Sequence, residues 1–238
     1  MTLPGRTAVI TGASSGIGEA VARSLCKAGV KLLLTARREQ RLRSLADQLP
    51  ATSFLAGDLT DPDLPQRLIE QALEDHGSCD IVVSNAGMIE TGSIEEIDLE
   101  RISRMVRINT ESAFRLAYVA LRHFRRVGRG HLIHTSSLLG TKVREGAGAY
   151  SGTKFALEAL SESLRLELAG TGIQVSCIEP GLVRTELHEH YEVHPAEALG
   201  MSDPLQPEDV ARCIRFVLEQ PPHVRIPRLM VLPGEGRL

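Results

Sequence analysis

The stretch Thr11-Gly12-Ala13-Ser14-Ser15-Gly16-Ile17-Gly18 decides the fold of this chain. Residues 7–10 before it suit a buried strand, and residues 17–27 have the periodicity of an amphipathic helix. Glycines at such a turn permit a tight bend and let backbone N–H groups approach a pyrophosphate at the positive end of the helix. The spacing is G-x-x-x-G-x-G, not the general G-x-G-x-x-G fingerprint. We predict a nucleotide-binding turn, with tight packing alone as the alternative use of the glycines.

Beyond this turn, short apolar runs alternate with amphipathic segments. Strands are expected at residues 7–10, 31–35, 53–56, 80–83, 130–135, 174–178 and 229–232. Helices are expected at residues 17–27, 39–48, 62–75, 99–127, 150–168 and 207–219. The alternation predicts an α/β fold, a Rossmann-type doubly wound parallel sheet of about seven strands with helices on both faces.

The chain, residues 1–238, shows no linker or internal repeat, so we expect a single dinucleotide-binding and catalytic domain. Residues 182–206 fit no regular element and contain prolines. In a parallel α/β sheet they follow the carboxyl end of a strand, where ligands bind. We therefore expect this segment to be a variable loop that covers the substrate.

The composition is ordinary for a soluble globular protein, with 42% hydrophobic and 24% charged residues. A net charge of −3 disfavours a protein that binds nucleic acid by neutralising phosphates. No apolar stretch approaches about 18 residues and no signal-peptide pattern is present, so we expect a cytoplasmic protein with no membrane partner. The cysteines Cys26, Cys79, Cys177 and Cys213 lack metal-ligand spacing and are expected to be buried free thiols.

Tyr150 and Lys154 are the strongest catalytic candidates. Residues four apart lie on one face of a helix, about one turn from each other. A phenol has a pKa near 10, and a neighbouring ammonium lowers that pKa and makes the hydroxyl useful for proton transfer. Such a pair also arises by chance, so its weight comes from the glycine turn and from Ser137 at the end of an expected strand.

Five segments, taken in order, resemble the signatures of the short-chain dehydrogenase/reductase family. They are the glycine turn, Ser84-Asn85-Ala86-Gly87, Ser137, Tyr150-x-x-x-Lys154 and Pro180-Gly181. The resemblance extends over nearly the whole chain, and it implies hydride transfer between a nicotinamide cofactor and a small alcohol or carbonyl substrate. Ser84 stands where the family often has Asn, a departure that leaves the rest of that motif intact.

The resemblance also implies the roles at the reacting centre. Tyr150 would donate a proton to the substrate oxygen, Ser137 would polarise that oxygen, and Lys154 would lower the pKa of Tyr150 and hold the nicotinamide ribose. Asn109 would hold a water in a proton relay to solvent. Ser136 is the alternative to Ser137, although the family's serine-to-tyrosine interval is met at Ser137, and a buried, hydrogen-bonded asparagine is the alternative for Asn109.

The end of the second expected strand bears on the cofactor. An acidic residue there would bind the ribose 2′-OH of NAD, whereas an arginine accommodates a 2′-phosphate. Here Ala36 stands at the family's acidic position and Arg37 follows it, so we predict NADP(H); solvated loop charges are the alternative. The cofactor-binding residues that the resemblance implies are Gly12, Ser14, Ser15, Gly16, Ile17, Gly18, Arg37, Arg38, Asp58, Leu59, Asn85, Ala86, Gly87, Tyr150, Lys154, Pro180, Gly181, Val183 and Thr185. For Asp58, capping of the Asp61–Pro62 turn is an alternative.

The histidines His188, His190 and His194 invite a metal hypothesis, but their pattern is not H-E-x-x-H and the proposed chemistry needs no metal. We predict no metal site; some of these side chains, with Tyr191, are candidates for the substrate pocket. A nucleotide-sensing protein on the same fold is a second function class, in which the tyrosine or lysine is often lost.

The substrate is the least constrained feature. Residues 224–233 resemble the branch of the family that oxidises serine and related 3-hydroxy acids with NADP. Arg144 or Arg184 would pair with a substrate carboxylate or would simply be surface charges. The alternative is a reductase of ketones, aldehydes or 3-oxoacyl thioesters. Long apolar stripes on the expected helices at 99–127 and 150–168 indicate a homotetramer, as is usual in the family, with a dimer as the alternative.

Overall fold

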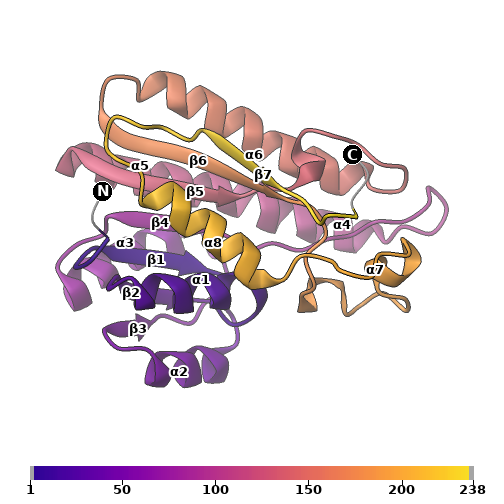
Figure 1. Ribbon diagram of the computed structural model, residues 1–238, viewed down its shortest axis with the longest axis horizontal. Coiled ribbons are helices and arrows are strands. Elements are labelled where there is room, and N and C mark those ends of the chain that lie inside the picture. The colour runs from indigo at the N-terminus through magenta and orange to yellow at the C-terminus, as the bar shows by residue number, and fades with distance from the viewer. Residues whose placement is uncertain (1–2, 236–238) are drawn as a thin grey trace.

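A parallel sheet forms the centre of the molecule (Figure 1), in a computed structural model that describes residues 3–235. Within these residues the sheet has seven strands in the order β3-β2-β1-β4-β5-β6-β7. Every neighbouring pair is parallel. The prediction of a doubly wound α/β sheet is confirmed. The strands are β1 (Thr7–Thr11), β2 (Lys31–Thr35), β3 (Thr52–Phe54), β4 (Ile81–Ser84), β5 (Arg129–Thr135), β6 (Gly172–Pro180) and β7 (Arg228–Val231).

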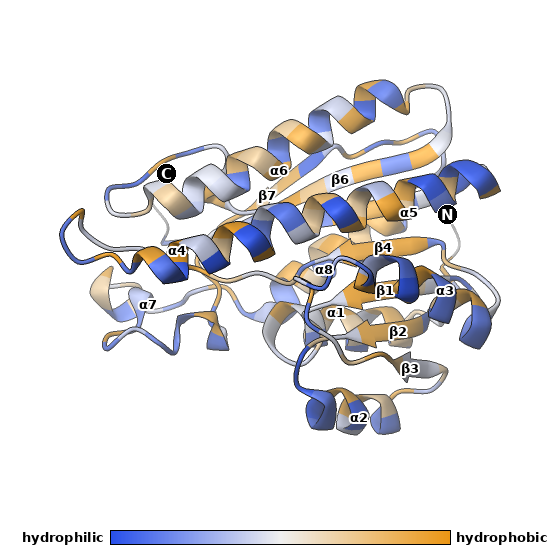
Figure 2. Cartoon of the chain, turned by 180° about the vertical axis from the view of Figure 1, so that it is seen from behind, coloured by the Kyte–Doolittle hydropathy of each residue, from blue (hydrophilic) through white to orange (hydrophobic). Residues whose placement is uncertain are grey.

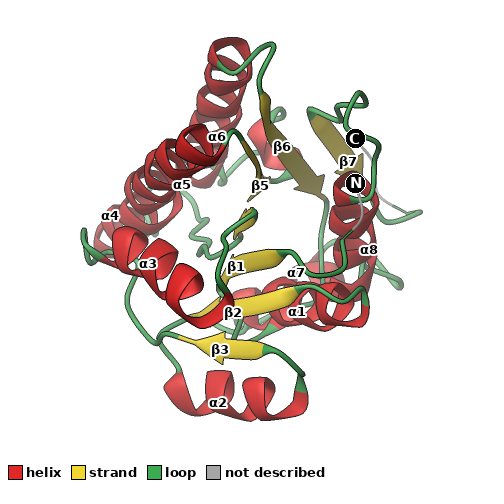
Figure 3. Cartoon of the chain, turned by 90° about the vertical axis from the view of Figure 1, so that its left-hand side faces the viewer, coloured by secondary structure: helices red, strands yellow, loops and turns green. Residues whose placement is uncertain are grey.

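Helices cover both faces of the sheet. Figure 3 shows α3, α5 and α6 on one side and α1 and α8 on the other. The helices are α1 (Gly16–Lys27), α2 (Glu39–Gln48), α3 (Leu64–His76), α4 (Leu99–Val106), α5 (Ala113–Val127), α6 (Gly148–Glu167), α7 (Pro195–Ala198) and α8 (Pro207–Leu218).

The two faces bury separate hydrophobic clusters because successive strand residues point to opposite sides. Ile10 of β1 packs with Leu25 of α1 and Ile214 of α8. The preceding residue, Val9, packs with the cluster formed by α3, α5 and α6. Figure 2 shows this in the hydropathy colouring, where hydrophobic residues are concentrated in the strands. Strands buried on both faces therefore read as continuous apolar runs in the sequence.

The strand order reverses between β1 and β4, and ligands of open α/β sheets bind at such a switch point. The glycine turn follows β1, and the segment from Asn85 follows β4. The hydroxyl of Thr11 joins the two segments, because it accepts hydrogen bonds from the backbone N–H groups of Asn85 (2.9 Å) and Ala86 (3.0 Å).

The helix predicted at 99–127 is not continuous. A π-helical segment, Arg107–Ser112, separates α4 from α5. A single wide turn preserves the apolar stripe on either side, so periodicity alone does not reveal it. The interruption matters because it carries Asn109.

The predicted loop at 182–206 contains more regular structure than expected. It has a 3-10 turn at Glu186–His188 and the short helix α7. Its two ends meet at a bridge between Val183 and Leu205, so the segment is closed at its base.

The cysteine prediction was right for two of the four residues. All four thiols are free within the described part of the chain, but only Cys79 and Cys177 are buried, whereas Cys26 and Cys213 are half-buried. Between residues 3 and 235 we find no helix with the combined length and apolarity that a membrane crossing requires.

Candidate active site

A cavity of about 1010 Å³ lies at the carboxyl edge of the sheet, over the switch point. It is lined by the glycine turn, by segments that follow β2 to β6, by α6 and by part of the 182–206 loop. Gly18 and Asn109 are the predicted site residues that do not line it. Those that do are Gly12, Ser14, Ser15, Gly16, Ile17, Arg37, Arg38, Asp58, Leu59, Asn85, Ala86, Gly87, Ser137, Tyr150, Lys154, Pro180, Gly181, Val183 and Thr185.

The glycine turn is packed too tightly for side chains. Gly12 has φ +67°, and a Cβ there would lie 2.9 Å from the Cα of Ala86. At Gly18 a Cβ would lie 2.3 Å from the carbonyl oxygen of Gly12, so Gly18 closes the turn from behind. Gly16 has φ +55° and approaches the Thr185 methyl group, to which a Cβ would lie 3.1 Å away. The turn thus presents backbone to the cavity, as a pyrophosphate requires.

Arg38, rather than Arg37, contacts the phosphate turn. Its guanidinium donates to the Ser14 hydroxyl at 3.0 and 3.1 Å and to the Ser15 hydroxyl at 2.6 Å. Arg37 also lines the cavity, but its charge acts on Asp58. The NADP(H) prediction rests chiefly on Arg37, whereas in the structure Arg38 is the arginine that bonds the hydroxyls of the phosphate turn.

Asp58 lines the cavity and also caps its own turn. Its Oδ1 accepts hydrogen bonds from the Thr60 N–H and from the Thr60 hydroxyl, both at 2.9 Å. The backbone hydrogen bond from Thr60, with smaller help from Arg37, holds the pKa of Asp58 below its usual range. Asp58 therefore caps a turn through Thr60, which directly precedes the Asp61–Pro62 turn of the alternative hypothesis. It also lines the cavity, so capping and cofactor binding are compatible.

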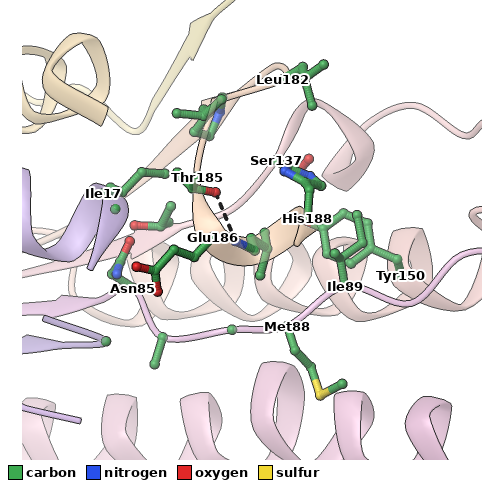
Figure 4. Close-up of a pocket in the computed structure, with 18 of the residues that line it drawn as sticks. Ile17, Asn85, Met88, Ile89, Ser137, Tyr150, Leu182, Thr185, Glu186 and His188 are labelled. Carbon is green, nitrogen blue, oxygen red and sulfur yellow. Dashed lines mark hydrogen bonds between the residues drawn. The ribbon is translucent and has the colours of Figure 1, made fainter. Parts of the chain in front are cut away.

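The three residues of the predicted reacting centre meet at one end of the cavity. Tyr150 and Lys154 come from α6, and Ser137 follows β5 at the start of a 3-10 turn. The Ser137 side chain lies near enough to Tyr150 to act on its pKa, and the Lys154 Nζ lies 5.8 Å from the centre of the Tyr150 ring. Figure 4 shows Tyr150 and Ser137 with His188 and Ile89 at this end, away from Ile17 and Asn85.

The pKa of Tyr150 differs from the expectation. Burial raises it to about 12, and the nearby Ser137 side chain offsets only part of that rise. Burial likewise lowers the pKa of Lys154 to about 8, against the opposing effects of Cys177 and Glu158. Burial therefore dominates the pKa of both groups in this structure, and the prediction that Lys154 lowers the pKa of Tyr150 stays a prediction.

Asn109 is buried behind the reacting centre. Its Oδ1 accepts a hydrogen bond from the Met88 N–H (2.9 Å), and its Nδ2 donates to the Met88 carbonyl (2.8 Å) and to the Thr153 hydroxyl (3.1 Å). The side chain therefore ties the segment after β4 to α6, next to Lys154. This geometry is that of a buried, hydrogen-bonded asparagine, and the proton-relay role stays a prediction.

Ser136 and Ser137 differ in their surroundings. The Ser136 hydroxyl is buried without a protein partner among the described residues and packs against Gly140, where a Cβ would lie 2.6 Å away. Ser137 instead acts on the pKa of Tyr150, and its Oγ accepts a hydrogen bond from the Leu139 N–H at 3.1 Å. The geometry favours Ser137 over Ser136.

His188 and Tyr191 line the cavity, whereas His190 and His194 do not. Burial lowers the pKa of His188 to about 4, so its ring is neutral near pH 7. The Tyr191 hydroxyl lies 2.8 Å from the Thr91 hydroxyl. In the part of the chain that the structure describes, no cluster of His, Cys, Asp and Glu side chains is arranged to hold a metal ion.

Sequence reasoning missed Glu186 and Arg41. The Glu186 carboxylate accepts from Arg38 and from Arg41, each at 2.6 Å, although these residues are far apart in the chain. No local pattern could have indicated the contact.

The model of the short chain dehydrogenase family matches residues 6–195. The chain belongs to this family. An uncharacterised oxidoreductase of Staphylococcus aureus is 33% identical over 233 residues, which are 97% of this chain and 98% of the relative. The chain is therefore an oxidoreductase of the short-chain dehydrogenase type.

Three solved structures are similar over 98% of this chain. An alcohol dehydrogenase from Thermococcus sibiricus, complexed with 5-hydroxy-NADP, has a TM-score of 0.87, 29% identity and 98% of its chain covered. The closed form of a serine dehydrogenase complexed with NADP+ has a TM-score of 0.91, 27% identity and 96% coverage. A 3-ketoacyl-(acyl-carrier-protein) reductase from Brucella melitensis, complexed with NADH, has a TM-score of 0.89, 26% identity and 98% coverage.

Proposed function

We propose that this protein interconverts a secondary alcohol or 3-hydroxy acid and the corresponding carbonyl compound, with NADP(H) as cofactor. The observation that carries the proposal is the position of Ser137, Tyr150 and Lys154 at one end of a cavity whose other end holds the glycine turn and Arg38. When bound, the nicotinamide cofactor supplies or accepts the hydride. The protein's own task is to orient the reactants and to move one proton.

The proton resides on Tyr150. With its pKa raised to about 12, the phenol is protonated near pH 7 and is ready to donate to a substrate oxygen during reduction. The Ser137 hydroxyl, beside Tyr150 in the cavity wall, stabilises the charge that develops on that oxygen. Lys154 then stabilises the phenolate left behind, because a charge buried this deeply needs an opposite charge nearby.

The residues at the far end of the cavity fit an NADP(H) molecule. Gly12 and Gly16 of the glycine turn present backbone to the cavity, and no carboxylate stands at Ala36 to repel a 2′-phosphate. Arg38, on the Ser14 and Ser15 hydroxyls, supplies a fork of donors suited to that phosphate. Equilibrium titration tests this: NADPH should bind at least about tenfold more tightly than NADH. Equal or tighter binding of NADH would overturn the NADP preference.

The cavity wall includes the apolar side chains Ile89, Leu139 and Leu182. Arg144 lines the cavity, whereas Arg184 is exposed and does not. Of the two arginines, Arg144 is thus the one placed to pair with a substrate carboxylate. This supports a 3-hydroxy acid as substrate, in line with the serine dehydrogenase among the structural neighbours.

A cofactor-coupled screen separates this substrate class from the alternative reductase of ketones, aldehydes or 3-oxoacyl thioesters. It follows NADPH consumption with aldehydes and β-keto esters, and NADP+ reduction with 3-hydroxy acids. If a 3-hydroxy acid is the substrate, Arg144→Gln should raise its KM by about tenfold or more, because a charge-assisted pair is lost, while Arg184→Gln should not. Turnover of neutral ketones alone, with no effect of Arg144→Gln, would favour the alternative.

We also infer a homotetramer, with a dimer as the alternative. Exposed apolar side chains stand on α4, α5 and α6, and α5 and α6 lie side by side in Figures 1 and 3. These side chains are Leu99, Val106, Tyr118, Val127, Phe155 and Leu166. Exposed apolar side chains on neighbouring helices are a feature of subunit interfaces. Light scattering that gives the mass of a monomer would contradict this inference.

A further inference from the structure

A carboxylate from the substrate loop lies between two arginines at the cofactor end of the cavity. Glu186, in the 3-10 turn after β6, accepts from the Nη1 of Arg38 through Oε2 and from the Nη1 of Arg41 through Oε1, both at 2.6 Å. Figure 4 shows the Glu186 side chain directed toward the side of the cavity where Ile17 and Asn85 lie. Each carboxylate oxygen thus has its own guanidinium.

Arg38 holds this carboxylate with one nitrogen while its other nitrogens bond the Ser14 and Ser15 hydroxyls of the phosphate turn. The same guanidinium is the one suited to a 2′-phosphate. A phosphate dianion and a carboxylate seek the same charged N–H donors. They cannot both occupy the Nη1 face of Arg38.

Glu186 is ionised, so it is able to compete with a phosphate for the arginines, and its ion pairs are weak enough for a phosphate to displace it. The hydrogen bonds from Arg38 and Arg41 keep the pKa of Glu186 below its usual range, so the group is ionised near pH 7. The side chains of the two arginines are 44% and 50% exposed and that of Glu186 is 33% exposed. Ion pairs with this exposure are individually weak, so a bound dianion is able to replace them.

Glu186 also belongs to a segment that reaches the substrate end of the cavity. Its neighbour Thr185 touches Gly16 of the phosphate turn, and His188, two residues later, lines the cavity near Tyr150. A movement of Glu186 therefore moves a segment that contacts both ends of the cavity.

We propose that Glu186 is a specificity-determining residue for the cofactor: it occupies Arg38 and Arg41 in competition with the ribose 2′-phosphate. This rests on the proposed preference for NADP(H). NADPH must displace Glu186 and in return gains both arginines, whereas NADH leaves the carboxylate in place. Arg41 thereby becomes a second phosphate ligand, one turn along α2 from Arg38.

The test is equilibrium binding, without turnover. NADPH and NADH are titrated by cofactor fluorescence, and 2′,5′-ADP and 5′-AMP by calorimetry, into the wild type, Glu186→Gln and Arg41→Gln. Glu186→Gln should tighten NADPH and 2′,5′-ADP by about threefold to tenfold, the range that partly exposed ion pairs support, and leave NADH and 5′-AMP within about twofold. Arg41→Gln should weaken only the two ligands that carry the 2′-phosphate.

Glu189→Gln is the matched control, since Glu189 is an exposed carboxylate three residues along the same loop that also lines the cavity. If this control tightens NADPH as much as Glu186→Gln, the effect is one of general charge and the proposal is overturned. In the double variant Glu186→Gln/Arg41→Gln, the gain from Glu186→Gln should shrink, because the two residues are in contact. If the effects of the two substitutions on NADPH affinity are fully additive in the double variant, the proposal is also overturned.

Failure of this proposal is distinguishable from failure of the NADP preference. Suppose that wild type prefers NADPH, that Arg38→Gln abolishes this preference, and that Glu186→Gln leaves all four affinities unchanged. Then only the proposed role of Glu186 is wrong. If wild type binds NADH as tightly as NADPH and Arg38→Gln has no effect, the cofactor preference itself is wrong.

Discussion

The ammonium of Lys154 donates a hydrogen bond to the backbone carbonyl oxygen of Thr135 at 2.9 Å, which joins α6 to the last residue of β5. Burial lowers the pKa of Lys154 to about 8, and Cys177 and Glu158 oppose that shift. Glu158 is buried, lies one turn further along α6 and does not line the cavity. The charge of the reacting centre therefore depends on a carboxylate outside the cavity wall.

Glu158→Gln should move the alkaline limb of the pH profile to lower pH. Loss of the carboxylate removes a factor that raises the pKa of Lys154, so the ammonium loses its proton earlier as pH rises. We expect kcat/KM for carbonyl reduction to fall roughly 0.5–1 pH unit earlier than in wild type, with rates at about pH 6 within threefold. Glu162→Gln, an exposed carboxylate on the same helix, is the control and should leave the limb in place. An unchanged limb in Glu158→Gln would mean that Glu158 does not set the charge of Lys154.

Tyr150→Phe should separate proton transfer from cofactor binding. The ring and its packing are retained, but the hydroxyl that would donate the proton is lost. We expect kcat to fall about 10²–10⁴-fold, the usual contribution of a positioned proton donor, while the Kd for NADPH stays within about threefold. Steady-state kinetics and cofactor titration measure the two quantities. Tyr118→Phe, which removes the hydroxyl of an exposed side chain on α5 that does not line the cavity, serves as control; wild-type turnover in Tyr150→Phe would refute the assignment.

The sequence was sufficient for the sheet and for most of the cavity wall, because both depend on local features. Apolar runs that alternate with amphipathic segments specify a parallel sheet, and the carboxyl ends of its strands must share one edge. The glycine turn, Asn85 and Ser137 each follow a strand, so their meeting at that edge follows from topology alone.

Other features depend on tertiary contacts that no local pattern encodes. Arg38 and Glu186 are 148 positions apart, and their pairing exists only because the loop after β6 folds over the phosphate turn. The wide turn at Arg107–Ser112 leaves the apolar stripe intact and so escapes periodicity. The high pKa of Tyr150 results from burial, which a spacing of four residues to Lys154 does not reveal.

Asn109→Ala should lower stability more than an ordinary polar substitution. It leaves the N–H and carbonyl groups of Met88 without their partner and removes a bond to Thr153. We expect the free energy of unfolding in urea to fall by about 2–4 kcal/mol, because buried groups are left unpaired. Ser112→Ala, which loses one bond to the Arg107 carbonyl in the same π-helical segment, should cost only about 1 kcal/mol. Equal losses in the two variants would show that Asn109 does not hold the segment after β4.

His134 makes the protein sensitive to acid. It is fully buried in β5, and neither ring nitrogen has a protein partner among the described residues. Burial, with Lys154 and Arg165 nearby, lowers its pKa to about 3. An unfolded histidine titrates near 6.5, so between these two values the unfolded chain binds a proton that the folded chain does not. Stability must therefore fall as pH decreases below about 6.5, and it continues to fall to about pH 3.

His134→Leu should remove this contribution. The variant has no ring nitrogen to leave unpaired, so we expect it to be at least as stable as wild type near pH 7.5. Between about pH 6.5 and 5, wild type should lose about 1–2 kcal/mol more than the variant, since one proton of linkage is worth about 1.4 kcal/mol per pH unit. Urea unfolding at a series of pH values measures the difference, and the exposed His223→Leu is the control. Buried His131, with its pKa also lowered to about 3 by burial, remains in every variant, so a residual acid loss is expected. Parallel losses in His134→Leu and wild type would show that His134 is protonated in the folded protein.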